Sequence, residues 1–120
     1  MKQITILWME RKITRVIITT PSDVTFDAQI ESDEPDLPSD GITPDFRRHR
    51  KESRRAYFQK IYEILDKSSE IVIFGSDNSK EDFLDYLSDH DQKVFNQVIG
   101  VEASGDMPEE KIVARGRKYI

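Results

Sequence analysis

Residues 46–65 read FRRHRKESRRAYFQKIYEIL, and the character of this stretch changes halfway along. The first half carries six cations against one acid. The second half is apolar at intervals of three and four residues, which places these side chains on one stripe of an α-helix. The members of the stripe are Tyr57, Phe58, Ile61, Tyr62, Ile64 and Leu65. The pattern predicts one long helix whose C-terminal half packs in a core while its N-terminal half presents a cationic surface.

We call the cationic half the basic arm, and we predict that it binds RNA. Its members are Arg47, Arg48, His49, Arg50, Lys51, Arg54 and Arg55. The alternative is a solvated helix face, but six cations within nine residues repel one another along a helix. Phe46 and Tyr57 lie beside the arm and offer aromatic surfaces on which bases can stack. The polar context of His49 favours a helix-surface residue over a general base.

The charge of the chain is strongly segregated. The formal net charge is −5, so the overall balance gives no argument for nucleic-acid binding. Residues 22–45 hold eight acids and no Lys or Arg, whereas residues 46–60 hold seven Lys or Arg and one acid. A polyanion responds to such local fields more than to the total charge. Residues 31–45 also contain three prolines and a glycine, which predicts an acidic flexible loop without packing of its own.

Composition excludes several classes of protein. A chain of 120 residues suits a single domain over residues 1–120, because two separate cores would be too small. The absence of cysteine removes disulfides, thiolate catalysis and Cys-ligated metals. No run approaches the roughly 18 apolar residues of a membrane span, and no signal-peptide core is present at the N-terminus. We therefore expect a cytoplasmic protein with no membrane partner.

Apolar periodicity predicts five strands, three helices and one short amphipathic turn or helix. The predicted strands are 4–9, 13–20, 24–30, 70–75 and 99–103. The predicted helices run from a cap at Thr43 or Asp45 to about residue 67, from about Ser79 to His90, and from a first turn at Pro108 to about Tyr119. Residues 94–98 are expected to form the short amphipathic turn or helix. Asp82 is spaced to complete a capping box with Ser79. Strand 24–30 alternates apolar and polar residues and should be half-exposed.

The order β-β-β-α-β-α-β-α then limits the topology. The first three strands are joined by short turns and should be antiparallel, whereas helix-linked strands should be parallel. Right-handed crossovers put helices on both faces of the sheet. We therefore predict an α/β fold with a mixed five-stranded sheet of ribonuclease-H-like type, in the order 3-2-1-4-5.

Enzymatic chemistry finds little support in the residues. A two-metal nuclease needs several carboxylates converging on the sheet. Strand 4–9 contains no acid, and the remaining candidates, Glu10, Asp27 and Asp85, are typical of solvated positions. The turn after residue 75 matches neither phosphate-binding glycine motif, and the acidic loop lacks the spacing of a calcium-binding loop. We predict no catalytic residues, no metal and no cofactor.

Several motifs, taken in order, resemble the middle domain of archaeal and eukaryotic class-1 peptide release factors. In the run GITPDFRRHRKESRRAYFQK, four residues match the segment that follows the Gly-Gly-Gln tip of that family: Phe46, Arg50, Tyr57 and Lys60. IVIFGSDNSKEDF is similar to the next strand, turn and helix start, where Gly75 and Lys80 match. VIGVEASGDM resembles small bacterial relatives of this domain, some of which carry the label of host-attachment proteins. Counted back from Phe46, the tip falls on Ser39, Asp40 and Gly41, so the catalytic tripeptide is absent.

The resemblance implies the translational-machinery-component fold, which is of ribonuclease-H-like type, and a ribosomal context without peptidyl-ester hydrolysis. The first hypothesis is a non-catalytic module that binds structured RNA or the ribosome, related to translation release and rescue factors. The second is a protein-interaction or regulatory domain whose basic arm docks on an acidic partner or on its own acidic loop. A metal-dependent nuclease is the third.

Overall fold

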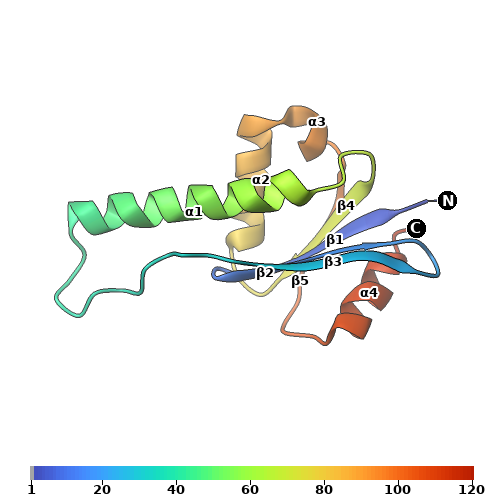
Figure 1. Cartoon of the computed structure of the whole chain (residues 1–120), viewed down its shortest axis with the longest axis horizontal. Helices are drawn as coiled ribbons and strands as arrows, with labels where there is room; N and C mark the ends of the chain where they lie inside the picture. Colours follow the sequence, from blue (N-terminus) through green and yellow to red (C-terminus); the bar gives the residue numbers. More distant parts are fainter. Residues whose placement is uncertain (1) are drawn as a thin grey trace.

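The structure, a computed structural model, describes residues 2–120 and contains one mixed five-stranded sheet with helices on both sides (Figure 1). The strands are β1 (Ile4–Met9), β2 (Ile13–Thr19), β3 (Val24–Glu31), β4 (Glu70–Gly75) and β5 (Val98–Ala103). The helices are α1 (Pro44–Ile64), α2 (Ser79–His90), α3 (Gln92–Phe95) and α4 (Glu109–Arg117). The strand order is β3-β2-β1-β4-β5, with β2 antiparallel to both neighbours and β4 parallel to β1 and β5. The predicted fold class and strand order are confirmed.

Strand β1 lies at the centre of the sheet, and all six of its residues are buried. Leu7 and Met9 face the core formed with α1, α2 and α3, whereas Ile6 and Trp8 face the core formed with α4. Period-two alternation thus supplies both cores from a single strand. As predicted, helices cover both faces of the sheet at β1. This strand contains no acidic residue.

Helix α1 begins as the sequence indicates and ends earlier than expected. The Thr43 hydroxyl accepts a hydrogen bond from the backbone N–H of Phe46 at 3.1 Å, and Pro44 occupies the first turn. The helix stops at Ile64 because Leu65 adopts an extended backbone, with ψ of 138°. Its N-terminal half extends beyond the ends of the strands (Figure 1), in a molecule that measures 52 × 30 × 21 Å. The basic arm therefore lies on a projecting helix.

Replacing Thr43 with alanine should remove about 1 kcal/mol of helix stability. Because the projecting half of α1 has few tertiary neighbours, we expect local fraying instead of global unfolding. Amide exchange at Phe46 and Arg47 should accelerate about fivefold, while Ser39→Ala in the same loop should leave it unchanged. Equal exchange rates in the two variants would contradict the role of the Thr43 hydroxyl as the N-cap of α1.

The remaining boundaries differ from prediction in the C-terminal half. The short helix lies at Gln92–Phe95, because the Asp91 carboxylate accepts from the Val94 N–H and starts it early. Strand β5 then begins at Val98, which pairs with Ile71. Pro108 precedes the last helix as its N-cap, and the helix ends at Arg117.

The predicted cap of α2 is also wrong. The N-cap is Asn78, without a side-chain hydrogen bond. The Asp77 carboxylate accepts instead from the Ser79 N–H at 2.8 Å, and the Asp82 carboxylate accepts from Arg54. The acid that fits a capping box in sequence therefore binds a neighbouring helix.

Strand β3 is the exposed edge of the sheet. Its apolar side chains Val24 and Phe26 are 44% and 39% exposed, because α1 covers β3 only near its other end, where Ile30 packs against the core. The alternation predicted the strand, but fewer of its apolar residues are covered than expected.

Candidate nucleic-acid interface

The basic arm has two faces with different environments. Arg50 and Arg54 are partly buried, since their spacing continues the stripe that buries Tyr57, Phe58 and Ile61 further along α1. The other members are exposed, and they are Arg47, Arg48, His49, Lys51 and Arg55. The helix thus divides the predicted site into an open face and a face turned towards the body of the protein.

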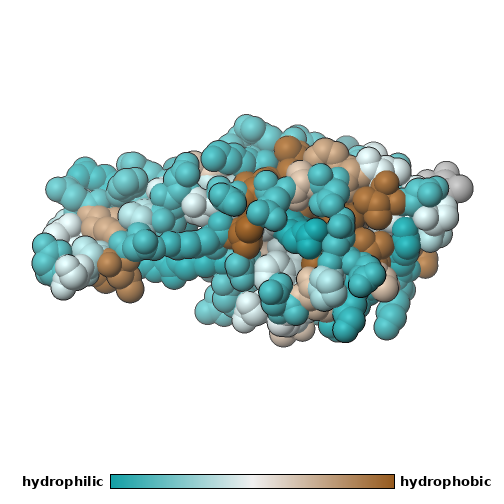
Figure 2. Space-filling view, turned by 60° about the horizontal axis from the view of Figure 1, so that its bottom comes forward, coloured by the Kyte–Doolittle hydropathy of each residue, from teal (hydrophilic) through white to brown (hydrophobic). Residues whose placement is uncertain are grey.

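The open face is a stripe of cations. Arg47, Lys51 and Arg55 follow one another at intervals of four and form no ion pair with any residue in the range 2–120. Arg48 pairs with Asp45 one turn earlier. On the face shown in Figure 2 the projecting end of the molecule is mostly hydrophilic, with a small apolar area near its tip.

A groove of about 660 Å³ separates the arm from α2. The α1 wall is cationic and includes Arg47, Lys51 and Arg55 of the open stripe. The α2 wall carries Asp82, Asp85 and Asp89. Phe58 and Tyr86 form its floor, with ring centroids 5.7 Å apart. The acids on α2 repel a polyanion from the inner part of this groove, so Arg47 and Lys51, towards the free end of α1, offer the better phosphate surface.

The inward face of the arm binds a carboxylate from the acidic loop. The side chain of Glu34 is only 2% exposed. Arg11 donates to it twice, from Nε to Oε2 at 2.8 Å and from Nη2 to Oε1 at 2.7 Å. Arg50 Nε donates to Oε1 at 2.9 Å, and Arg54 Nη1 lies 3.9 Å from Oε2. We call Arg11, Arg50 and Arg54 the arginine clasp.

Further contacts tie the acidic loop to the body of the protein. Asp36 pairs with Lys12, which lowers the pKa of that carboxyl, and Asp33 Oδ2 lies 3.8 Å from Lys60 Nζ. The Ser32 N–H donates to the Lys12 carbonyl at 2.8 Å. The expectation that residues 31–45 have no packing of their own is therefore wrong at Glu34, which is buried because three guanidinium groups surround it.

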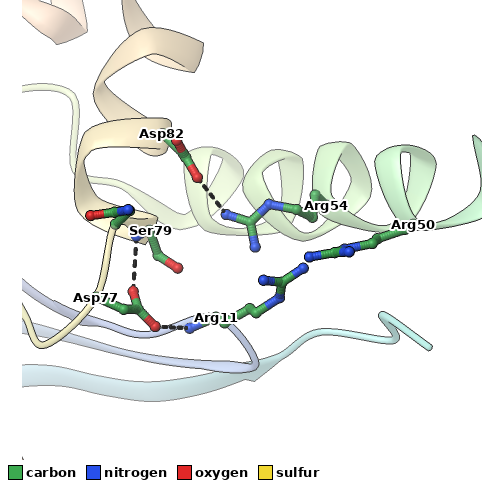
Figure 3. A pocket seen from close by; sticks show the side chains of 7 residues that line it. Arg11, Arg50, Arg54, Asp77, Ser79 and Asp82 are labelled. Atoms are coloured by element: carbon green, nitrogen blue, oxygen red, sulfur yellow. Dashed lines mark hydrogen bonds and ion pairs between the residues drawn. The ribbon is translucent and has the colours of Figure 1, made fainter. Parts of the chain in front are cut away.

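A cavity of about 440 Å³ adjoins the clasp where β1 and β4 end. Arg11, Arg50 and Arg54 point towards one another there, beside the first turn of α2 (Figure 3). Asp77 lies across from them and accepts from the Arg11 N–H at 2.9 Å. Burial raises the pKa of Asp77, but the hydrogen bonds from Ser79 and Arg11 and the charge of Arg54 outweigh it and lower the pKa overall. Hydrogen bonding to Glu34 raises the pKa of Arg11.

The carboxylates considered for a nuclease lie in different places. Glu10 lies near Asp77 and Asp106, and burial together with these two charges raises its pKa. Asp27 lies on β3 beside Arg15, and Asp85 lies on α2. Within residues 2–120 no three His, Asp or Glu side chains converge as metal ligands do. That the protein is not an enzyme stays a prediction.

The residues behind the release-factor resemblance have mixed roles here. Tyr57 is 1% exposed and its hydroxyl binds Thr14 and the Glu10 carbonyl, so the prediction that it stacks on bases is wrong. Lys80 is also buried, and its ammonium donates to the Asp77 carbonyl at 2.7 Å. Phe46 is half-buried on α1, whereas Lys60 is exposed. Gly75 allows β1 and β4 to approach closely.

Sequence reasoning missed Arg11 and Glu34. Arg11 stands in a turn between two strands, and Glu34 is one of eight acids in a segment without cations. Nothing in the local pattern distinguishes either residue from its neighbours. Only the fold brings them to the arm.

The described part of the chain contains no helix long and apolar enough to cross a membrane. No protein-family model matches the sequence, and no curated protein matches it.

The fold is similar to that of about a third of each of several release-factor-like translation factors. The structure is similar to the Pelota protein of Thermoplasma acidophilum, with a TM-score of 0.66 and 18% identity over 94% of this chain and 31% of that one. It is also similar to the archaeal translation termination factor aRF1, with a TM-score of 0.62 and 14% identity over 98% of this chain and 35% of that one.

A third similar structure is Dom34 of S. cerevisiae, with a TM-score of 0.57 and 13% identity over 97% of this chain and 33% of that one. Dom34 is described as a translation termination-like factor involved in RNA quality control pathways and interacting with Hbs1. The chain thus spans about a third of the length of these proteins, and identities this low establish the fold alone.

Proposed function

We propose that the protein is a non-catalytic RNA- or ribosome-binding module related to translation release and rescue factors. The observation that carries the proposal is the open stripe of Arg47, Lys51 and Arg55 on a helix that projects from a release-factor-like fold. Cations at intervals of four along a helix contact phosphates without reading sequence. The projection lets the stripe reach a groove of folded RNA that the body of the protein cannot enter.

The proposal excludes peptidyl-ester hydrolysis by this chain. None of its five glycines adjoins another, so the sequence contains no Gly-Gly-Gln tripeptide. In our interpretation the loop that holds Ser39, Asp40 and Gly41 occupies the place of that tip. We also propose that the protein belongs with the small bacterial relatives of this domain and that it acts in the cytoplasm.

The test replaces Arg47, Lys51 and Arg55 together with glutamine. Each lost phosphate contact reduces the slope of log K against log salt concentration by about 0.7 to 0.9, so the triple variant should lose roughly 2 to 3 in slope. Anisotropy titrations with a labelled tRNA transcript, at four potassium chloride concentrations, measure the slope.

The matched control removes the same charge elsewhere. Lys93, Lys111 and Lys118 are exposed, lie outside the arm and form no ion pair with any residue of the described range 2–120. Their triple glutamine variant should change the slope by much less than that of the arm. Equal losses in the two variants would show a general charge effect, and the arm would not be the contact surface.

The second candidate function is protein interaction, and the binding of Glu34 favours it. This contact shows that cations of the arm accept a carboxylate in this fold. Under this hypothesis the protein would bind no RNA at low salt, and an acidic peptide would shift the amide resonances of Arg47 and Lys51. Sedimentation of tagged protein through a sucrose gradient separates the candidates, because only RNA binding predicts salt-sensitive migration with ribosomal particles.

A further inference from the structure

From the contacts of Glu34 we infer that the arginine clasp is a phosphate-binding site, and that Glu34 occupies it in the free protein. In the bound state a phosphate of the RNA backbone takes the place of the Glu34 carboxylate. The choice of RNA as the source of the phosphate rests on the function proposed above. The site itself follows from the packing of Arg11, Arg50 and Arg54.

An anion that lies between three guanidinium groups stabilises their convergence on one point. Arg11 comes from the β1–β2 turn, and Arg50 and Arg54 come from successive turns of α1 (Figure 3). They repel one another unless a negative charge is present. Glu34 provides that charge in the free protein, with its side chain almost fully buried.

A carboxylate satisfies this site incompletely. Its two oxygens accept three hydrogen bonds from Arg11 and Arg50, at 2.7 to 2.9 Å. Arg54 is left 3.9 Å from the nearer oxygen, beyond hydrogen-bond distance. A phosphate group offers further oxygens and forms bidentate bonds with guanidinium groups, so it satisfies all three arginines.

The cavity beside the clasp supplies room for the exchange. It measures about 440 Å³ and opens next to the three arginines. Two carboxylates stand on its rim: Asp77 accepts from the backbone of Arg11, and Asp82 accepts from Arg54 at 3.2 Å. With Glu34 in place the three cations face three acids. When the loop withdraws, one positive charge is left over, and the site attracts an anion only in that state.

The contacts of the loop allow such a withdrawal. Besides Glu34 and the hydrogen bond from the Ser32 N–H to the Lys12 carbonyl, its links to the body are two ion pairs between exposed groups, Asp36 with Lys12 and Asp33 with Lys60. Exposed pairs of this kind are weak and are screened by salt. The two exposed apolar side chains of the loop, Leu37 and Ile42, do not anchor it in the core. Glu34 is therefore the main attachment that an incoming phosphate has to displace.

The experiment replaces Glu34 with glutamine, which keeps the shape of the side chain and removes its charge. One further phosphate contact at 0.1 M salt strengthens RNA binding about five- to eightfold and steepens the salt slope by about 0.7 to 0.9. Glu34→Gln should show this gain in the tRNA titration. Asp36→Asn removes the same charge from the same loop and should change affinity less than twofold, and adding Arg11→Gln to Glu34→Gln should abolish the gain.

A second measurement is independent of RNA and keeps the inference separate from the proposed function. Inorganic phosphate at 10 mM should raise the melting temperature of Glu34→Gln by several degrees over chloride of equal ionic strength, and should shift the Nε–H resonances of Arg11 and Arg50. Wild-type protein should show neither response. If Glu34→Gln is partly unfolded in chloride, the same addition of phosphate should restore its structure.

Three results would overturn the inference. The first is that Glu34→Gln and wild type respond equally to phosphate, and the second is that Glu34→Gln keeps its gain in RNA affinity after Arg11→Gln is added. The third is that Glu34→Gln responds to acetate as it does to phosphate, which would assign the clasp to a carboxylate of a protein partner. A response to inorganic phosphate without any RNA binding would instead retain the site and reject the proposed function.

Discussion

Replacing Gly75 with alanine should destabilise the protein by about 3 kcal/mol or more, a loss at the upper end for a single methyl group. A Cβ at this position would lie 2.2 Å from the backbone oxygen of Met9. That atom belongs to β1, and it cannot move without separating β1 from β4, which pair in parallel through Met9 and Gly75. Urea unfolding followed by circular dichroism measures the loss.

Gly105→Ala is the matched control for Gly75→Ala. An added Cβ at Gly105 meets no atom within 4 Å. Its stability should change by less than about 0.5 kcal/mol, since exposed substitutions away from packed features usually do so. If Gly75→Ala is as stable as Gly105→Ala, the close approach of β1 and β4 does not constrain the sheet.

Replacing Tyr57 with alanine should cost about 3–5 kcal/mol, as for other large aromatic residues removed from a core. The ring of Tyr57 is 1% exposed and stacks on Phe58 at 5.9 Å. Tyr57→Phe removes only the hydroxyl, which lies 2.5 Å from the Thr14 hydroxyl and donates to the Glu10 carbonyl at 2.9 Å. Since the Thr14 hydroxyl then loses a buried hydrogen bond and the Glu10 carbonyl a partly buried one, we expect a loss of about 1–3 kcal/mol.

The phenol of Tyr57 also makes stability depend on pH at the alkaline end. Burial raises its pKa, so the folded protein keeps the proton more tightly than the unfolded chain does. The contribution is fully present below a pH of about 10, the pKa of an unfolded tyrosine, and is lost as the pH rises through the folded pKa. Wild type should therefore lose stability above pH 10 more steeply than Tyr57→Phe.

Binding and unfolding measured together determine what Tyr57 does. Tyr57→Phe should bind RNA as wild type does at temperatures where both are folded, because the ring is not available for stacking. Tyr62→Phe, which removes a hydroxyl bonded to Asp91 at 2.5 Å, serves as the comparison. If Tyr57→Phe had normal stability and reduced RNA affinity, Tyr57 would contact RNA, and the conclusion drawn from its burial would be wrong.

Most of the fold follows from local sequence patterns. The stripe that ends at Leu65, the β-branched strand 13–20 and the buried strand 70–75 each repeat over enough residues to specify their type. Short connections between the first strands require antiparallel pairing, and helical connections between the later ones favour parallel pairing. Those constraints leave the order 3-2-1-4-5, which the structure has.

Element ends and caps were predicted less well, because single side chains compete for them. Asp82 has the spacing of a capping acid, yet a guanidinium group on α1 binds it. Asp77, one position before the N-cap, takes the Ser79 N–H instead. Hydrogen bonds between elements outweigh the local capping preference. The sequence of one helix or strand does not indicate which other element packs beside it.

By itself the sequence of 120 residues determined the secondary structure, the sheet order and the position of the basic arm on an amphipathic helix, because each of these depends on spacing along the chain. Only the tertiary structure decided which cations of the arm are exposed to solvent and which lie against the carboxylate of Glu34. Arg11 and Glu34 are separated from Arg50 by 39 and 16 residues along the chain. They meet because the β1–β2 turn, the acidic loop and α1 converge at the end of the sheet where β1 ends. Charge pairs of this kind depend on distances of a few ångströms in space, and the order of residues along the chain carries no record of those distances.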